Sequence, residues 1–399
     1  MPDGPVRVGG RVTRTQPPVL WIHDAFATVK ATASATVAGA FQELGAGDLV
    51  TLEGRLAGGE LREATVVQVH HRPGPTPTAE GARLRDRGVA HHLRRRAAIF
   101  GTVRRFFEDR GYLEVETPAL VPSPGLDLHL DAFEIPEAFP DQRGYLITSP
   151  EYQMKRLLSG GLPRLFQLAR CFRRGELGER HNPEFTMVEW YRAFGTVEAM
   201  MAETEDLLRH VVERHRGTAE DGTAGRRIDW PAPFERWTVA SAFERFANQS
   251  PAETGALARD DEDQFFRLLV ERVEPGLVSL DRPVFLHDYP ATMASLARLK
   301  PAEPEVCERF ELYVGDLELC NGFGELTEPV EQRRRFQRDQ RRRKELGKPV
   351  YPLDERLLGA LEEGMPPAAG NALGLDRLVA LCIGTDTIAD VQAFPAEWL

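Results

Sequence analysis

The sequence contains few cysteines and lacks the motifs that mark several large classes of enzyme. Four of its 399 residues are cysteine, Cys171, Cys307, Cys320 and Cys382, and no two of them form a CxxC pair. Such isolated thiols favour a reducing, cytoplasmic location over disulfides or a zinc knuckle. The chain also has no GxxxxGK[ST] phosphate loop and no GxSxG elbow, which argues against a P-loop nucleotidase and an α/β-hydrolase.

Long apolar runs and metal-ligand spacings are also missing. No stretch approaches the roughly 20 apolar residues needed to cross a bilayer, and the opening MPDGPVRVGG lacks the pattern of a signal peptide. The histidines His91, His92 and His181 do not show metal-ligand spacing. The formal net charge of −11 gives no general sign of nucleic-acid binding. With 42% hydrophobic residues, the chain can bury two or three cores.

Residues 1–72 are predicted to form a small β-barrel module. Turns such as 57–60 separate short β-prone stretches, which is typical of an OB-like fold. The stretches that read as strands are 7–15, 19–37, 48–56 and 61–71. Residues 1–80 carry seven Lys or Arg and eight Asp or Glu, and this neutral balance weakens, without excluding, a role in gripping a phosphate backbone. A packing or stabilising role is the alternative.

A linker and a larger second unit follow the predicted barrel. The composition of PGPTPT at 73–78 is typical of a linker, which we place at 73–90. Residues 91–399 show no later break, so they are predicted to form one α+β domain. Within it, residues 92–111 have the apolar period of a helix that ends at Gly111.

Two stretches are predicted to pair as antiparallel strands, 166–174 and 184–192. Strict alternation then places Phe185, Glu189 and Tyr191 on one face. A carboxylate beside a phenol makes a cradle for an ammonium group. A structural ion pair would produce the same pattern, so this signal alone leaves both interpretations open.

The stretch 310–328 suggests a site for a metal ion and phosphate. Gly315-Asp316 suits a two-residue hairpin turn, which would place Glu311 diagonally beside Glu318. Two adjacent carboxylates are unfavourable unless a cation lies between them, and Mg²⁺ holding phosphate oxygens is the natural candidate. An exposed acidic hairpin is the alternative. Because the polar residues that follow have the opposite parity to Glu318, we expect an irregularity near Gly322.

Two further stretches carry arginines. Residues 370–384 read as a Gly-rich strand that runs into an apolar helix, and Arg377 at the helix start could clamp phosphate. A Gly-rich turn before a helix is common, so this pattern alone carries little weight. A dense basic helix is predicted at 331–348. It is either a solvated face or a docking surface for an acidic partner or RNA.

Taken together, these stretches resemble the class II aminoacyl-tRNA synthetases of the lysyl type. Motifs 1, 2 and 3 of that family resemble FFEDRGYLEVETP, FRRGELGERHNPEFTMVEWY and GNALGLDRLVAL, in this order along the chain, and NGFGEL resembles the lysine-site segment. Within the group, YLITSPEYQMKRLL and ELCNGFGELTEPVEQRRRF are similar to the ligases that modify elongation factor P. The resemblance covers about residues 92–399.

That resemblance implies a domain of antiparallel sheet flanked by helices that works as a homodimer. It implies activation of lysine or (R)-β-lysine, with ATP and Mg²⁺, to an aminoacyl adenylate, followed by transfer to a lysine side chain of elongation factor P. A lysyl-tRNA synthetase that charges tRNA(Lys) is the rival interpretation. A non-catalytic synthetase-like regulator is a third, against which the retained arginines and carboxylates argue.

The resemblance also implies roles for individual residues. Arg173 and Arg377 would be catalytic, on the α- and γ-phosphate, and Glu311 and Glu318 would hold the metal. The implied ATP-binding residues are Arg173, Glu176, His181, Phe185, Glu311, Glu318 and Arg377. The implied substrate-binding residues are Glu151, Glu189, Tyr191, Asn321, Phe323, Glu325 and Ala372. Glu189 is expected to have no protein partner, because the substrate ammonium would fill that role.

Two positions differ from the lysyl synthetase pattern. Motif 2 begins Phe-Arg-x-Glu in that family, whereas here Gly175 stands in the glutamate position and Glu176 follows one place later. The sequence does not decide which of the two replaces it. Ala372 stands where lysyl-tRNA synthetases have glycine, and one methyl group in a pocket can shift substrate choice by roughly 1–3 kcal/mol. The alanine is shared with the ligases and implies a preference for (R)-β-lysine.

Overall fold

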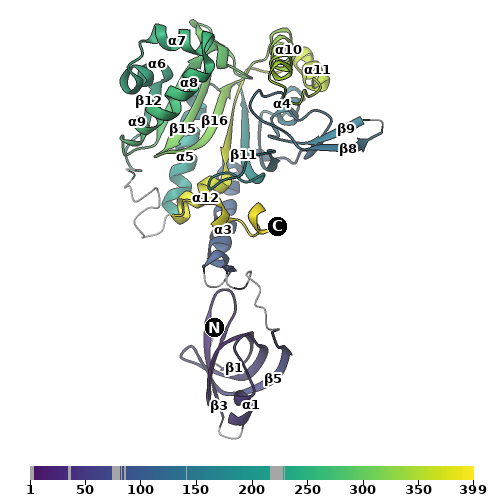
Figure 1. Ribbon diagram of the computed structural model, residues 1–399, viewed down its shortest axis with the longest axis vertical. Helices are drawn as coiled ribbons and strands as arrows, with labels where there is room; N and C mark the ends of the chain where they lie inside the picture. The colour runs from purple at the N-terminus through teal and green to yellow at the C-terminus, as the bar shows by residue number, and fades with distance from the viewer. Residues whose placement is uncertain are drawn as a thin grey trace. The chain divides into compact units, whose positions relative to one another are not determined.

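The computed structural model in Figure 1 describes most of the chain as two compact units. The described residues are 4–34, 37–73, 81, 83–84, 87–140, 142–215, 228 and 230–399. Contacts between residues divide the chain into Met1–Arg94 and Arg95–Leu399, and each unit is described by itself. Of the linker predicted at 73–90, residues 74–80, 82, 85 and 86 lie outside the described residues.

The first unit is built on five strands that form a closed ring. They are β1 (Gly4–Gln16), β2 (Val19–His23), β3 (Thr28–Ala33), β4 (Leu49–Ala57) and β5 (Glu60–His71), with α1 (Ala38–Gln42) between β3 and β4. The pairing order is β1-β2-β3-β5-β4, and β4 pairs back with β1. The predicted strand at 19–37 is divided in two, because the Asp24 carboxylate accepts hydrogen bonds from the backbone N–H groups of Phe26 and Ala27 and forms a turn.

The second unit is centred on a nine-stranded sheet. Its strands are β6 (Leu113–Glu114), β10 (Arg164–Phe172), β11 (Glu184–Ala193), β12 (Glu235–Thr238), β13 (Val284–Pro290), β14 (Leu299–Lys300), β15 (Glu303–Val314), β16 (Leu317–Gly324) and β17 (Ala368–Gly374). The order is β12-β13-β15-β16-β17-β11-β10-β6, and β14 pairs with β15. The predicted all-antiparallel sheet is wrong at both edges, where β6 pairs with β10 and β12 with β13 in parallel. Long connections between these strands permit parallel pairing.

Helices pack around the sheet of the second unit (Figure 1). They are α3 (Val89–Glu108), which begins in the first unit, α4 (Glu151–Ser159), α5 (Val197–His215), α6 (Val239–Ala242), α7 (Pro251–Asp260), α8 (Glu262–Leu268), α9 (Glu274–Val278), α10 (Pro329–Glu345), α11 (Glu355–Gly364) and α12 (Leu375–Ile383). The helix predicted at 92–111 is confirmed as α3, and Gly111 has a positive φ of 73° in the turn that follows it. None of the helices in the described ranges combines the length and apolar character needed to span a bilayer.

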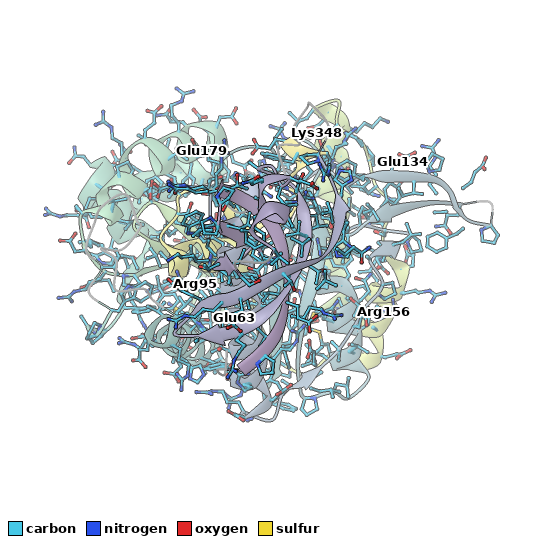
Figure 2. All side chains as sticks on the ribbon, turned by 90° about the horizontal axis from the view of Figure 1, so that it is seen from below. Glu63, Arg95, Glu134, Arg156, Glu179 and Lys348 are labelled. Carbon is cyan, nitrogen blue, oxygen red and sulfur yellow. The ribbon has the colours of Figure 1, made fainter. Side chains whose placement is uncertain are left out.

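A small additional sheet stands apart from the main one. Its order is β7-β9-β8, with β7 at Leu120–Val121, β8 at Glu134–Phe139 and β9 at Gln142–Leu146. The hairpin of β8 and β9 projects from the rest of the second unit in both views, with the exposed Glu134 on β8 (Figures 1 and 2).

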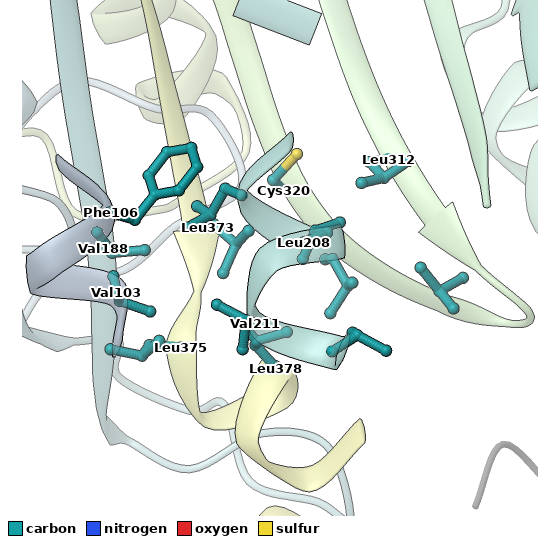
Figure 3. Packing of buried hydrophobic residues seen from close by; sticks show 14 of the residues in the cluster. Val103, Phe106, Val188, Leu208, Val211, Leu312, Cys320, Leu373, Leu375 and Leu378 are labelled. Atoms are coloured by element: carbon teal, nitrogen blue, oxygen red, sulfur yellow. The ribbon is translucent and has the colours of Figure 1, made fainter. Parts of the chain in front are cut away.

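The main core lies between the central strands and three helices (Figure 3). Its fully buried residues include Val103 and Phe106 of α3, Leu208 and Val211 of α5, Leu375 and Leu378 of α12, and Val188, Leu312 and Leu373 of the sheet. A separate cluster packs α4, α10 and α11 against the other face, where Tyr191 of β11 is buried. Because both faces of β11 are packed, its side chains are held rigidly.

The basic helix predicted at 331–348 is confirmed as α10, but its interpretation as a solvated face is only partly correct. Arg343 is fully buried and donates hydrogen bonds to the carbonyl oxygens of Asp127 and Leu130 at 2.6 and 2.9 Å. It also forms an ion pair with Asp131 at 2.5 Å. This arginine therefore anchors the loop 124–131 to α10.

The four cysteines are unbonded and buried, in agreement with the prediction of reduced thiols. Burial raises the pKa of each thiol above its ordinary value. They are therefore protonated core residues.

Candidate active site

A cavity of about 840 Å³ opens in the second unit over the central strands of the sheet. Its walls come from β11, β15, β16, β17, the start of α12, the loop 173–182 and the loop 124–130. The predicted site residues that line it are Glu151, Arg173, Glu176, His181, Phe185, Glu311, Glu318, Asn321, Phe323, Ala372 and Arg377. The other three, Glu189, Tyr191 and Glu325, are buried residues that lie outside the lining itself. The structure thus gathers most of the predicted residues around one space.

The pairing of β10 with β11 positions the side chains that β11 contributes to the cavity wall. The two strands are antiparallel, as predicted, and their register places Cys171 opposite Phe185 and Gln167 opposite Glu189. Alternation along β11 gives Phe185 and Met187 to the cavity, whereas Val188 belongs to the main core.

The loop between these strands brings a second set of groups to the cavity. The Arg173 guanidinium carbon lies 5.0 Å from the ring centroid of Phe185 and a guanidinium nitrogen lies 3.7 Å from a carboxylate oxygen of Glu176. Gly175 has a φ of 88°, a conformation that favours glycine. Glu176, one residue later, lines the cavity. The carboxylate that accompanies Arg173 is therefore that of Glu176.

Arg377 and His181 meet at the same end of the cavity. Arg377 donates to Nε2 of His181 at 2.8 Å and to the backbone oxygen of Glu318 at 2.7 Å. Burial and the positive charge of Arg377 lower the pKa of His181. The imidazole is therefore neutral at neutral pH and accepts the hydrogen bond.

The hairpin of β15 and β16 presents the two predicted metal-binding carboxylates. The Gly315-Asp316 turn forms as predicted, with Tyr313 opposite Glu318. The expected irregularity exists but lies at Leu319. Leu312 of β15 pairs with Cys320, and the following residue, Tyr313, pairs with Glu318, so the register skips Leu319. This bulge is what allows Glu318 and the residues of opposite parity to face one cavity.

Glu311 is held by three donors that the sequence did not predict. One carboxylate oxygen accepts hydrogen bonds from the hydroxyls of Tyr289 and Tyr313 at 2.6 and 2.8 Å. The other accepts from Arg309 at 2.7 Å. Tyr313 lies two residues after Glu311 on the same face of β15, so strand alternation could have predicted this contact. Tyr289 lies on β13, and no local pattern indicated its contact with Glu311. Glu311 is therefore fixed in place before any ligand binds.

Glu318 is the freer carboxylate of the pair. Its side chain is 43% exposed and its nearest cation is Arg377 at 3.9 Å. Desolvation within the site and the charge of Glu311 raise its pKa. Two such carboxylates suit a hard cation that brings further oxygen ligands. Among the described residues, there is no group of three or more His, Cys, Asp or Glu that could hold a metal ion.

Glu189 has hydroxyl partners, which corrects the expectation that it is left unpaired. Its carboxylate accepts hydrogen bonds from Ser149 at 2.7 Å and from Tyr191 at 2.5 Å. Within the described part of the chain it forms no ion pair. Burial and the nearby charge of Glu151 raise its pKa. Glu189 is thus hydrogen-bonded yet lacks a positive partner.

Lys155, which the sequence analysis did not single out, connects the remaining acidic residues. Its ammonium lies 2.5 Å from Glu151 and 2.6 Å from Glu325. The i,i+4 spacing of Glu151 and Lys155 on α4 is a signal that could have been used. The contact with Glu325 joins residues 170 positions apart and gives no local signal.

Three of the predicted substrate-binding residues lie side by side across three strands. Ala372 of β17 pairs with Glu189 on one side and with Asn321 on the other. The side-chain oxygen of Asn321 is buried and has no hydrogen-bond donor among the described residues. An orphaned acceptor in a cavity wall is suited to a ligand N–H group.

Comparisons with known proteins agree with this geometry. A family model for class II tRNA synthetases (D, K and N) matches residues 78–397. Elongation factor P–(R)-β-lysine ligase of Photorhabdus laumondii is 40% identical over 328 residues, which is 79% of this chain and 98% of the relative. The ligases of the same name from Proteus mirabilis and Klebsiella pneumoniae are each 42% identical, over 76% and 77% of this chain and 94% and 95% of the relatives. The chain therefore belongs to the class II tRNA synthetase family, to the same branch as the elongation factor P–(R)-β-lysine ligases.

Proposed function

We propose that this protein uses ATP to activate lysine or (R)-β-lysine as an aminoacyl adenylate and transfers it to a lysine side chain of elongation factor P. The observation that carries the proposal is the division of one cavity into two ends. Arginines and the carboxylates of Glu176, Glu311 and Glu318 line one end, and Glu151, Asn321 and the buried Glu189 form the other. The names of the relatives support the acceptor and the amino acid.

At the phosphate end, Arg173 and Arg377 neutralise the charge that develops on ATP. Positioning and charge neutralisation supply most of the catalysis in such a reaction. Phe185 offers a ring face for adenine, and His181 helps to orient Arg377. Glu311 and Glu318 would hold Mg²⁺, and the partly exposed Glu318 fits that role well. When bound, the ion would screen the phosphate charge.

At the amino-acid end, carboxylates receive the ammonium groups of the substrate. Glu151 faces the cavity, and Glu189 accepts only hydroxyl hydrogen bonds, so it has capacity for a cation. Asn321 has a free side-chain oxygen, and Phe323 and Ala372 shape the apolar part. Tyr191 and Glu325 are buried beneath the amino-acid end and do not line the cavity.

The reaction needs no protein nucleophile. The substrate carboxylate attacks the α-phosphorus of ATP, forming a new P–O bond while pyrophosphate leaves. The neutral amine of the acceptor lysine then attacks the carbonyl carbon of the adenylate, and an amide forms as AMP leaves. Arg173 would contact the α-phosphate in both steps.

The remaining features of the chain are assigned by the same proposal. Residues 1–72 form an OB-like module, 73–90 a linker and 91–399 the catalytic domain; the ring order β1-β2-β3-β5-β4 supports the first of these. The catalytic domain acts as a homodimer in the cytoplasm. Binding of tRNA is not favoured.

The decisive experiment offers both acceptors to the same adenylate. The protein is incubated with ATP, Mg²⁺ and labelled lysine or (R)-β-lysine, and either elongation factor P or tRNA is added. Label on the protein acceptor, stable as an amide, is the expected result. Label on tRNA alone would replace the proposal with a lysyl-tRNA synthetase, and no adenylate from either amino acid would overturn both.

A further inference from the structure

Lys155 is a buried cation placed behind the amino-acid end of the cavity. Its side chain is 2% exposed, and its ammonium contacts the carboxylates of Glu151 and Glu325. Burial opposes its charge, but the two carboxylates outweigh this and raise its pKa above the ordinary value. The ammonium is therefore permanently charged.

The carboxylates on either side of Lys155 differ in their access to the cavity. Glu325 is fully buried, and burial raises its pKa. Glu151 lines the cavity, and only its Oε1 is engaged by Lys155. Among the described residues, no hydrogen bond or ion pair engages its second oxygen, which leaves that oxygen for a ligand.

Ser149 links Glu151, the partner of Lys155, to Glu189, which is the third carboxylate at the amino-acid end of the cavity. The Ser149 hydroxyl donates to Glu189 and accepts a hydrogen bond from the backbone N–H of Glu151 at 3.1 Å. Charged and titratable groups around the cluster come from several elements. They are Glu151 on α4, Glu189 and Tyr191 on β11, and Glu325 and Arg298 from the segments flanking β14 to β16.

The charges at this end then balance in a simple way. Glu151, Glu189 and Glu325 carry three negative charges when ionised, and Lys155 removes one, while the charge of Arg298 is balanced by its own ion pair with Glu308. The two that remain match the two ammonium groups of a diamino acid. A pocket with three uncompensated carboxylates would hold a proton in place of the missing cation, because adjacent buried carboxylates do not all ionise.

We propose that Lys155 is a positioning residue that holds the Glu151 carboxylate directed at the cavity, and that it thereby selects amino acids with two ammonium groups. The inference rests on the proposed function, since it names the substrate selection of the same cavity. Lys155 does not touch the substrate. It acts through Glu151, and Glu325 serves as its buried counterion.

The test replaces Lys155 with methionine, which keeps the length of the chain and removes the charge. ATP–pyrophosphate exchange is measured with the lysine isomer that the wild type activates, and with norleucine, which has no side-chain ammonium. In Lys155→Met, KM for lysine should rise about tenfold or more, the size expected for a weakened charge-assisted contact. The maximal rate should change less, and the preference for lysine over norleucine should fall by a similar factor.

The pH profile provides a readout that a purely structural role would not move. In Lys155→Met, the buried Glu325 loses the cation that favours its carboxylate form, so it should bind a proton more readily and the KM for lysine should gain an ionisation that the wild type lacks. The double variant Lys155→Met/Glu325→Gln removes the second carboxylate, and the extra ionisation should disappear. This variant removes the fully buried Glu325 carboxylate together with its counterion Lys155, so it also serves if the single variant fails to fold: an extra ionisation there would overturn the inference.

Lys300→Met is the matched control. Lys300 forms an ion pair with Asp288 at 2.7 Å and does not line the cavity, so its loss should leave lysine preference and the pH profile unchanged. If Lys155→Met melts at a lower temperature but keeps the wild-type preference and profile, Lys155 is only structural and the inference is wrong. If the wild type itself exchanges no pyrophosphate with either lysine isomer, the proposed function has failed instead.

Discussion

Arg377 donates a hydrogen bond to Nε2 of His181 across 2.8 Å, and the two residues are 196 positions apart in the chain. The bond joins the loop between β10 and β11 to the first turn of α12. Arg377 is fixed on the other side by the backbone oxygen of Glu318. One arginine thus holds together three elements at the phosphate end of the cavity.

This hydrogen bond predicts how ATP affinity depends on pH. His181 must be neutral to accept from Arg377, and its pKa is lowered by burial and by Arg377. The midpoint of its protonation therefore lies below the ordinary value of about 6.5, and protonation would place two positive groups together. We expect KM for ATP to stay level at neutral and higher pH and to rise in acid, at a pH below that ordinary value, measured by pyrophosphate exchange. In His181→Asn, the acid-side rise should be absent.

Removal of the Arg377 side chain should abolish most of the exchange reaction. Arg377→Ala loses a phosphate-facing charge and frees His181, so we expect exchange to fall by roughly 100-fold or more, the range seen for preorganised charge stabilisers. Arg356→Ala, on the exposed side of α11, is the control and should retain wild-type exchange. Near-normal exchange in Arg377→Ala would contradict the assignment.

Glu189 predicts proton release when lysine binds. Its pKa is raised by burial and by Glu151, so part of the population is protonated near neutral pH. A substrate ammonium favours the carboxylate, and binding should therefore expel a proton and tighten as pH rises from 6 to 8. Calorimetry in buffers of different ionisation enthalpy measures this release. The Glu189→Gln variant should bind weakly and release no proton; equal release in both proteins would exclude Glu189 as the source.

Substitution of Ala372 should change the preference between (R)-β-lysine and α-lysine. Its position beside Glu189 and Asn321 places its methyl group at the amino-acid end of the cavity. In Ala372→Gly, the ratio of kcat/KM for (R)-β-lysine to that for α-lysine should fall by about ten- to 100-fold, as expected for one methyl group. Ala369→Gly changes the same strand at a core position and should leave the ratio unaltered.

Arg343 predicts a structural effect on the cavity wall. Arg343→Ala would leave Asp131 and the carbonyl oxygens of 127 and 130 without their buried donor. Breaking such a buried pair costs about 3–5 kcal/mol, so the melting temperature should fall and the loop 124–131 should exchange its amide hydrogens faster. Arg341 is exposed on the same helix, and Arg341→Ala should change neither quantity.

The local elements of this protein follow from the sequence itself. The pairing of 166–174 with 184–192 and the face shared by Phe185 and Glu189 follow from two-residue alternation. The Gly315-Asp316 turn and the helix ending before Gly111 follow from turn and cap chemistry. These features depend on residues that are neighbours in the chain. The motifs behind the family resemblance are also contiguous stretches, so they could be recognised from the sequence.

Other features were decided only when distant segments packed together. The contact of Lys155 with Glu325, the hydroxyl of Tyr289 on Glu311 and the burial of Arg343 join residues far apart in the chain. The irregularity in β16 was expected, but its position at Leu319 was not, and the parallel edge strands also escaped prediction, since local pattern does not fix register or connection. Alternation and turn chemistry set where a side chain points, but burial in a shared core determines which distant charge it meets, and that charge sets its protonation and its chemistry.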